Sequence, residues 1–143
     1  IERAFKLCFP LPYTRGDLDL AIFFQNIASN YYVFAEMLDA DTYQEQLCGY
    51  LNDAPVEHDY EALAYAMGFE DVPSNLCFPV SFNREMSFFK DIEDGTEYAT
   101  NRKILYLYCT ETGLLFSSGD GTTIFGNRFS TDFLVAMCEE VFG

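Results

Sequence analysis

The chain has 143 residues, of which 50% are hydrophobic and 17% aromatic, and its formal net charge is −15. This length is typical of one domain, and the apolar content is too high for a disordered chain. The surplus of acid argues against nucleic acids and anionic membrane surfaces as partners, because both are bound by basic faces. We therefore expect a single acidic domain over residues 1–143.

The first part of the sequence predicts a strand and a long helix. Large apolar residues alternate with smaller or polar ones over residues 5–11, a pattern typical of a strand. From Asp17 to about Leu38 the pattern becomes helical and is apolar nearly all round. Asp17 and Asp19 fall in the first turn of this helix, where the helix dipole favours carboxylates.

Two further helices are expected in the next stretch. The first covers about residues 42–51, which open with the spacing of a capping box. The second is expected to start after Asp53, with Pro55 in its first turn, and to end at Gly68. The N-terminal part of the domain is therefore predicted to be helical.

The second half of the sequence predicts strands and one closing helix. Residues 76–82 alternate, and residues 103–109 are apolar on both alternating faces, which is typical of a central strand. A hairpin strand is expected over 114–117 and another strand over 122–125. Ser130 is expected to cap the last helix.

Together these elements predict an α+β fold. Its helical N-terminal part would pack on an antiparallel β-sheet of four to six strands, and a C-terminal helix would close the domain. The segment from Arg84 to Ile92 fits a strand or a helix equally well.

The cysteines indicate a reducing environment. There are five of them, widely spaced and among apolar residues: Cys8, Cys48, Cys77, Cys109 and Cys138. An odd count without any C-x-x-C pair favours buried free thiols and a cytoplasmic location. A single histidine cannot complete a zinc set, so no metal and no cofactor is expected.

The sequence contains no catalytic motif that we recognise. The only histidine, His58, stands between Glu57 and Asp59, but neighbours on a helix point in different directions. The segment 118–123 resembles a phosphate loop but lacks the lysine of that motif. We therefore expect a protein that is not an enzyme.

One long stretch of the chain contains many acidic residues and no basic ones. Between Arg15 and Arg84 there are twelve carboxylates and no lysine or arginine. Tyrosines are interleaved with these acids, and tyrosine is over-represented at binding hot spots. We call the candidate partner-binding residues the acid–tyrosine surface: Glu36, Tyr43, Tyr50, Glu57, Asp59, Tyr60, Glu61, Tyr65, Glu70 and Asp71.

This overall character resembles bacterial toxin immunity proteins of the contact-dependent growth inhibition type. In addition, Lys103-Ile104-Leu105-Tyr106-Leu107-Tyr108, a turn, a short strand and then Phe129-Ser130-Thr131-Asp132-Phe133-Leu134 resemble the end of the SMI1/KNR4 family. Many members of that family are toxin immunity proteins, so the resemblance implies an immunity function.

The expected function is that of an acidic, non-enzymatic inhibitor. It would bind and block the active site of a basic protein, as a cytoplasmic immunity protein neutralising a nuclease toxin. Two alternatives stay open, namely a DNA-mimic inhibitor of a DNA-binding enzyme and a small ligand-binding or enzymatic α+β domain. The oligomeric state is not predicted.

Overall fold

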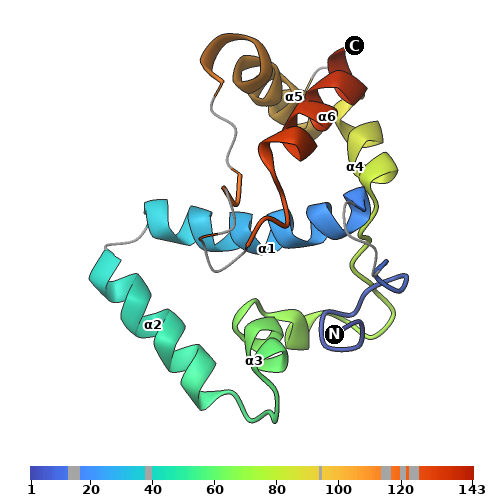
Figure 1. Ribbon diagram of the computed structural model, residues 1–143. Coiled ribbons are helices and arrows are strands. Elements are labelled where there is room, and N and C mark those ends of the chain that lie inside the picture. Colours follow the sequence, from blue (N-terminus) through green and yellow to red (C-terminus); the bar gives the residue numbers. More distant parts are fainter. Residues whose placement is uncertain (13–16, 38–39, 94, 114–116, 120–121, 123–125) are drawn as a thin grey trace. The chain divides into compact units, whose positions relative to one another are not determined.

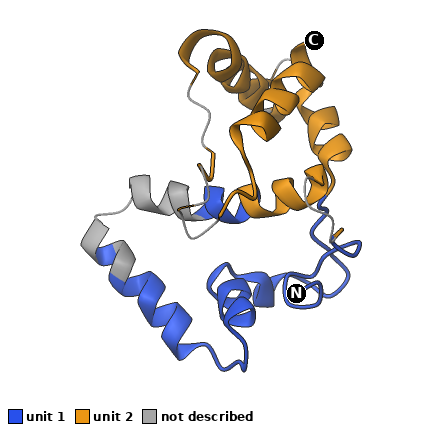
Figure 2. Ribbon diagram, viewed as in Figure 1, with its two compact units in different colours: residues 1–11, 26–80 blue, residues 12–25, 81–143 orange. Residues whose placement is uncertain are grey.

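The chain forms two compact units. In the computed structural model, residues 1–12, 17–37, 40–93, 95–113, 117–119, 122 and 126–143 are described, except for the side chains of 31–37, 40, 41, 43, 44 and 97. The first unit comprises residues 1–11 and 26–80, and the second comprises 12–25 and 81–143 (Figure 2). The expectation of a single domain stays a prediction.

The regular secondary structure of the described residues is helical (Figure 1). The helices are α1 (Leu18–Met37), α2 (Ala40–Asp53), α3 (Asp59–Ala66), α4 (Phe82–Phe89), α5 (Glu97–Leu107) and α6 (Thr131–Phe142), with a 3-10 turn η1 (Phe69–Asp71) and a π-helical turn η2 (Tyr108–Thr112). The α+β prediction with its antiparallel sheet is wrong, because the described part of the chain contains no strand longer than a single bridge. None of the described helices is both long and apolar enough to span a membrane.

The first unit is built around an aromatic cluster. The ring of Phe69 meets those of Phe5 and Phe78 edge to face, with centroids 5.3 and 5.4 Å apart. A disulfide between Cys8 and Cys77 joins the same two segments. Helix α2 contacts α3, and α3 contacts η1. The rings and the disulfide together hold the chain start against residues 69–78.

The expected strands at 5–11 and 76–82 are wrong as strands, although they do meet. The N–H of Phe78 donates to the Lys6 carbonyl over 2.7 Å, and the N–H of Cys8 donates to the Phe78 carbonyl over 3.1 Å. Pairing stops at this one bridge, between Leu7 and Phe78. Proline lacks the N–H that a ladder needs, so Pro10 and Pro79 explain the early end.

The second unit contains three helices that contact one another, α4, α5 and α6 (Figure 1). Their buried side chains are Phe82 and Met86 of α4, Ala99 of α5, and Phe133, Leu134, Met137 and Val141 of α6. Burial of such side chains is the main source of stability for helices of this length. Ser130 caps α6 by accepting a hydrogen bond from the Phe133 N–H, which confirms its predicted role.

The strand expected at 103–109 is also wrong, because this segment lies in α5 and η2. Apolar residues on both faces of a short run fit a buried helix as well as a strand. Here Thr96 decides for a helix, since its hydroxyl accepts the Ala99 N–H over 3.1 Å as an N-cap. Residues 114–116 and 123–125, expected in the other strands, lie outside the described residues.

The other helix predictions are confirmed in type. Helix α1 begins one residue after Asp17, whose carboxylate accepts the Asp19 N–H over 2.9 Å. Helix α2 runs two residues further at each end than expected. Helix α3 begins at Asp59, later than predicted, and Gly68 follows it with the left-handed φ of 75° that favours glycine.

The free-thiol prediction is wrong for four of the five cysteines. Cys8 pairs with Cys77 inside the first unit, and Cys109 pairs with Cys138 inside the second. Only Cys48 is free, and it is exposed. Sequence spacing could not show this, because each pair is brought together by the fold of its own unit.

We expect iodoacetamide to modify only Cys48 when the protein is denatured without a reductant, because the other four thiols are paired. Peptide mapping should then recover the 8–77 and 109–138 links. Reduction should lower the free energy of unfolding by about 2–5 kcal/mol per bridge. Modification of all five cysteines in the unreduced protein would contradict the assignment.

A second prediction concerns the start of α4. The N-cap residue Ser81 makes no side-chain cap, and the Phe82 N–H donates instead to the Asp19 carboxylate over 2.6 Å. Asp19→Ala should therefore lower the free energy of unfolding by about 1 kcal/mol in urea denaturation. Asp132→Ala, in the first turn of α6, serves as the matched control, and an equal loss there would argue against a special cap.

Candidate functional site

The acid–tyrosine surface falls within the first unit. Its described side chains are exposed or half-buried: Glu57, Asp59, Glu70, Asp71 and Tyr50 are exposed, and Tyr60, Glu61 and Tyr65 are half-buried. Glu36 and Tyr43 have their backbones in α1 and α2, but their side chains lie outside the described part. The other eight lie on or beside α2, α3 and η1, which contact one another in succession.

The charge of this unit is not neutralised from within. Residues 1–11 and 26–80 hold eleven acidic residues but only two basic ones, Arg3 and Lys6. The Lys6 ammonium donates to the backbone carbonyls of Glu70 and Val72 rather than to a carboxylate. Among the described acids of this unit, Glu57, Asp59, Glu70 and Asp71 are exposed to solvent. Their role in partner binding stays a prediction.

His58 does not form a catalytic pair in the described structure. It is exposed at the start of α3 and its ring stacks on Tyr60, with centroids 5.3 Å apart. No hydrogen bond links it to a serine among the described residues, whereas a nucleophile and its base lie within about 2.6–3.2 Å. The prediction of a surface histidine is confirmed.

Ser118 is the buried serine of the second unit, and it acts as a clamp. Its hydroxyl donates to the Phe129 carbonyl over 3.1 Å and accepts the Phe129 N–H over 3.2 Å. The Ser118 N–H donates to the same carbonyl over 2.9 Å. A hydroxyl engaged as both donor and acceptor holds two chain segments together and is not presented as a nucleophile.

The fold changes the ionisation of Glu85 on α4. It lies half-buried on α4, and this burial raises the pKa of its carboxyl above the ordinary value of 4.5. The neighbouring Arg84 acts in the opposite direction but more weakly. Arg84 itself lies over the Phe88 ring, 5.7 Å from its centroid. At neutral pH the ionised, half-buried Glu85 carboxylate therefore lowers the stability of the folded protein.

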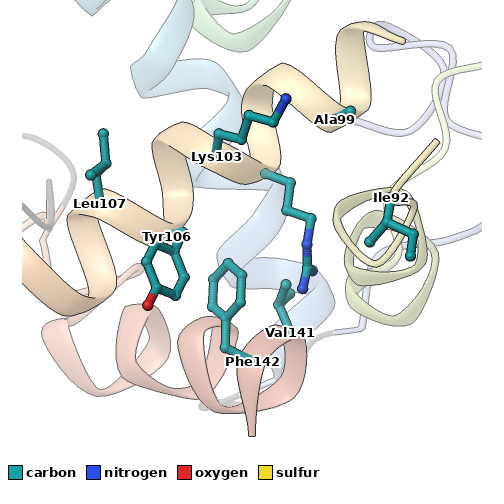
Figure 3. A pocket seen from close by; sticks show the side chains of 8 residues that line it. Ile92, Ala99, Lys103, Tyr106, Leu107, Val141 and Phe142 are labelled. Atoms are coloured by element: carbon teal, nitrogen blue, oxygen red, sulfur yellow. The ribbon is translucent and has the colours of Figure 1, made fainter. Parts of the chain in front are cut away.

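The second unit also contains an open hollow of about 600 Å³. Its lining comes from α5, α6 and the segment after α4: Ile92, Ala99, Arg102, Lys103, Tyr106, Leu107, Val141 and Phe142. Figure 3 shows Phe142 rising from α6 beside Tyr106 of α5, with Ile92 on the other side. This volume lies within the roughly 300–1,000 Å³ of small-molecule sites.

Arg102 ties the three helices around this hollow together. Its Nη1 donates to the Phe89 carbonyl at the end of α4 over 2.7 Å. Its guanidinium carbon lies 4.6 Å from the centre of the Phe142 ring on α6. Tyr106 meets the same ring edge to face at 5.4 Å. One wall of the hollow is therefore a guanidinium held by a carbonyl and by the Phe142 ring, which Tyr106 supports from its edge.

The charge of the hollow is opposite to that of the chain. Two of its eight lining residues, Arg102 and Lys103, are basic, and no Asp or Glu is among the described residues that line it. Nearby Glu140 is paired with Lys90. In a chain with a net charge of −15, this hollow is suited to an anion.

Sequence reasoning missed the hollow because it read 103–109 as a strand. On a helix, residues 99, 102, 103 and 106 share one face through their i, i+3, i+4 and i+7 spacing. The adjacent Arg102 and Lys103 are the one pair of consecutive basic residues in the sequence, which was an available signal. Among the described residues, no group of three or more His, Cys, Asp or Glu could hold a metal ion.

Comparison with known proteins identifies the family. A model of the serine carboxypeptidase S28 family matches residues 1–143, the whole chain. The chain belongs to this family. Searches of curated proteins and of solved structures found no significant match.

Membership of the serine carboxypeptidase S28 family corrects the functional predictions. It indicates a hydrolase, so the expectations of a non-enzymatic inhibitor and of an immunity protein for a nuclease toxin are wrong. The segment Lys103 to Tyr108, on which the resemblance to the SMI1/KNR4 family partly rested, is helical and not the strand that its apolar pattern predicted. The alternative of an enzymatic domain fits better, although not as an α+β fold.

Glu85 yields a prediction about pH. Because its pKa is raised in the folded state, the folded protein carries a penalty above that pKa which disappears as the pH falls. Glu85→Gln should therefore raise the melting temperature at pH 7, and its advantage should shrink as the pH falls towards about 4.

The control for this experiment is Glu139→Gln, which removes an exposed carboxylate of α6. It reports the benefit of losing any one negative charge from this acidic chain. If both variants gained equally at pH 7, burial of Glu85 would not be the cause.

Proposed function

We propose that this chain functions in a serine carboxypeptidase, an enzyme that hydrolyses the last peptide bond of a substrate with a free C-terminus. The observation that carries the proposal is the family match over residues 1–143. The proposed substrate is a peptide. This replaces the earlier expectation, drawn from the charge, that the chain binds and blocks a nuclease toxin. A cationic partner for the acid–tyrosine surface remains a prediction from charge alone.

Within such an enzyme, we assign the described residues to support and substrate binding rather than to the nucleophile. A serine peptidase needs a serine hydroxyl hydrogen-bonded to a histidine that is itself oriented by an acid. His58 is exposed and has no such contact with a described serine, and the Ser118 hydroxyl is engaged by the Phe129 backbone. The helices and the hollow on α5 and α6 are the parts that remain for recognition.

We also propose an oxidising compartment for this protein. The cytoplasmic expectation depended on free thiols, and four of the five cysteines are paired. Disulfides persist where thiols are not kept reduced, as in secreted proteins and luminal compartments. In such a compartment both disulfides of the peptidase would stay formed.

The proposal predicts release of the C-terminal amino acid from N-blocked peptides by the intact protein that contains residues 1–143. Mass spectrometry should detect the freed residue from peptides with a free carboxylate and far less from the matching C-terminal amides. A fluorophosphonate that reacts with an activated serine should abolish the release. Activity that survives this reagent, or no release at all, would count against a serine carboxypeptidase.

A variant tests the assignment of His58. Because its ring is exposed and contacts no described serine, His58→Ala should keep kcat/KM within about twofold of the parent. Removal of a general base costs about 10²–10⁴ in rate. A loss of that size with an unchanged circular dichroism spectrum would show that His58 is the base after all.

A further inference from the structure

We propose that the hollow on α5 and α6 binds the free carboxylate and the apolar side chain of a peptide's C-terminal residue, with Arg102 as the carboxylate-binding group. This inference rests on the proposed carboxypeptidase function, since it names the part of the substrate that distinguishes that class. The argument comes from the donors of Arg102, the lining of the hollow and its charge.

Most of the N–H donors of Arg102 make no hydrogen bond with the described residues. A guanidinium carries five N–H donors, and one of them is used in the bond to the Phe89 carbonyl. The other four have no hydrogen-bond partner among the described residues, although the side chain lines the hollow and is half-buried. The planar guanidinium matches a carboxylate in a two-pronged hydrogen bond, which an ammonium cannot make.

The guanidinium is also held in place before any ligand arrives. The Phe89 carbonyl fixes one edge, and the Phe142 ring lies against one face at 4.6 Å. Tyr106 in turn packs edge to face against Phe142. A group oriented in this way loses little freedom on binding, so more of its interaction energy appears as affinity.

The rest of the lining suits an apolar side chain. Ile92, Tyr106 and Leu107 are 76, 48 and 50% exposed, which is unusual for large hydrophobic residues that lie on one hollow. A ligand that covered them would remove apolar surface from water. Figure 3 shows these side chains around the space beside Phe142.

Charge selects the anionic end of the ligand. Lys103 adds a second positive charge to the lining, and no carboxylate is among the described lining residues. A peptide amide offers no charge to the Arg102 guanidinium, whereas a free C-terminus does. The hollow is therefore expected to distinguish a C-terminal acid from the same residue as an amide.

The test compares N-acetyl-phenylalanine with N-acetyl-phenylalaninamide by isothermal titration calorimetry on the intact protein. The two probes differ only in the group that Arg102 is proposed to bind. The acid should bind at least about tenfold more tightly than the amide, which is the usual effect of a hydrogen bond to a charged group. Equal affinities, or no saturable binding of the acid, would overturn the inference without any variant being made.

Variants then locate the site. Arg102→Gln should remove the preference for the acid, and Lys103→Gln, at a more exposed position, should reduce it about two- to fivefold. Arg84→Gln on α4 removes the same charge from the same unit but lies outside the hollow, so it should keep the preference. An Arg102→Gln protein that is folded by circular dichroism and still prefers the acid would refute the role of this residue.

This experiment separates the two proposals. If the protein binds the acid more tightly than the amide but releases no amino acid from peptides, the binding site is supported and the carboxypeptidase function is contradicted. If the protein is an active carboxypeptidase without that preference, the function is supported and the binding site is contradicted. In an active enzyme, Arg102→Gln should raise KM about tenfold for peptides with a free C-terminus and leave kcat nearly unchanged.

Discussion

The second unit depends on the position of one guanidinium. Arg102 of α5 binds the carbonyl that ends α4 and lies against the Phe142 ring of α6, so a single side chain contacts all three helices. The Cys109–Cys138 disulfide links the turn after α5 to α6 a second time. Because η2 follows α5 directly, the two links restrain α5 and its continuation against α6, so α5 has little freedom to turn about its axis. The hollow beside Phe142 is the surface that this fixed orientation produces.

The net charge of the chain proved a poor guide to its function. The acid-rich first unit suggested a basic partner, yet surplus acid describes solubility and encounter rates rather than fold or activity. Its exposed carboxylates at Glu57, Asp59, Glu70 and Asp71 make no ion pair with described residues. The informative charges are the few basic ones, because in a chain with 8 basic and 23 acidic residues each cation has many possible acidic partners. Arg102 is held by a carbonyl and an aromatic ring instead.

The sequence predicted helices where caps and periodicity agreed, and it failed where a short apolar run had two readings. Asp17 and Ser130 marked helix starts correctly because a cap is a local hydrogen bond within a few residues. Residues 103–109 were misread because the cap that decides them, Thr96, stands seven residues upstream of that run. The disulfides and the Arg102 contacts join residues 13 to 69 positions apart, and no local pattern could indicate them. Because part of α5 was predicted to be a strand, the hollow could not be predicted from the sequence.

The requirements on position 102 explain why arginine is the residue found there. Three things are asked of the side chain at once: a donor for the Phe89 carbonyl, a flat face for the Phe142 ring, and a positive charge in the hollow. A lysine ammonium could satisfy the first and the last, but it is a compact point charge without a planar face. It would also be more strongly hydrated and less easily held between two helices. After making its structural contacts, arginine keeps its remaining donors in a fixed planar arrangement, so one residue can both hold the helices together and offer an anion an oriented partner.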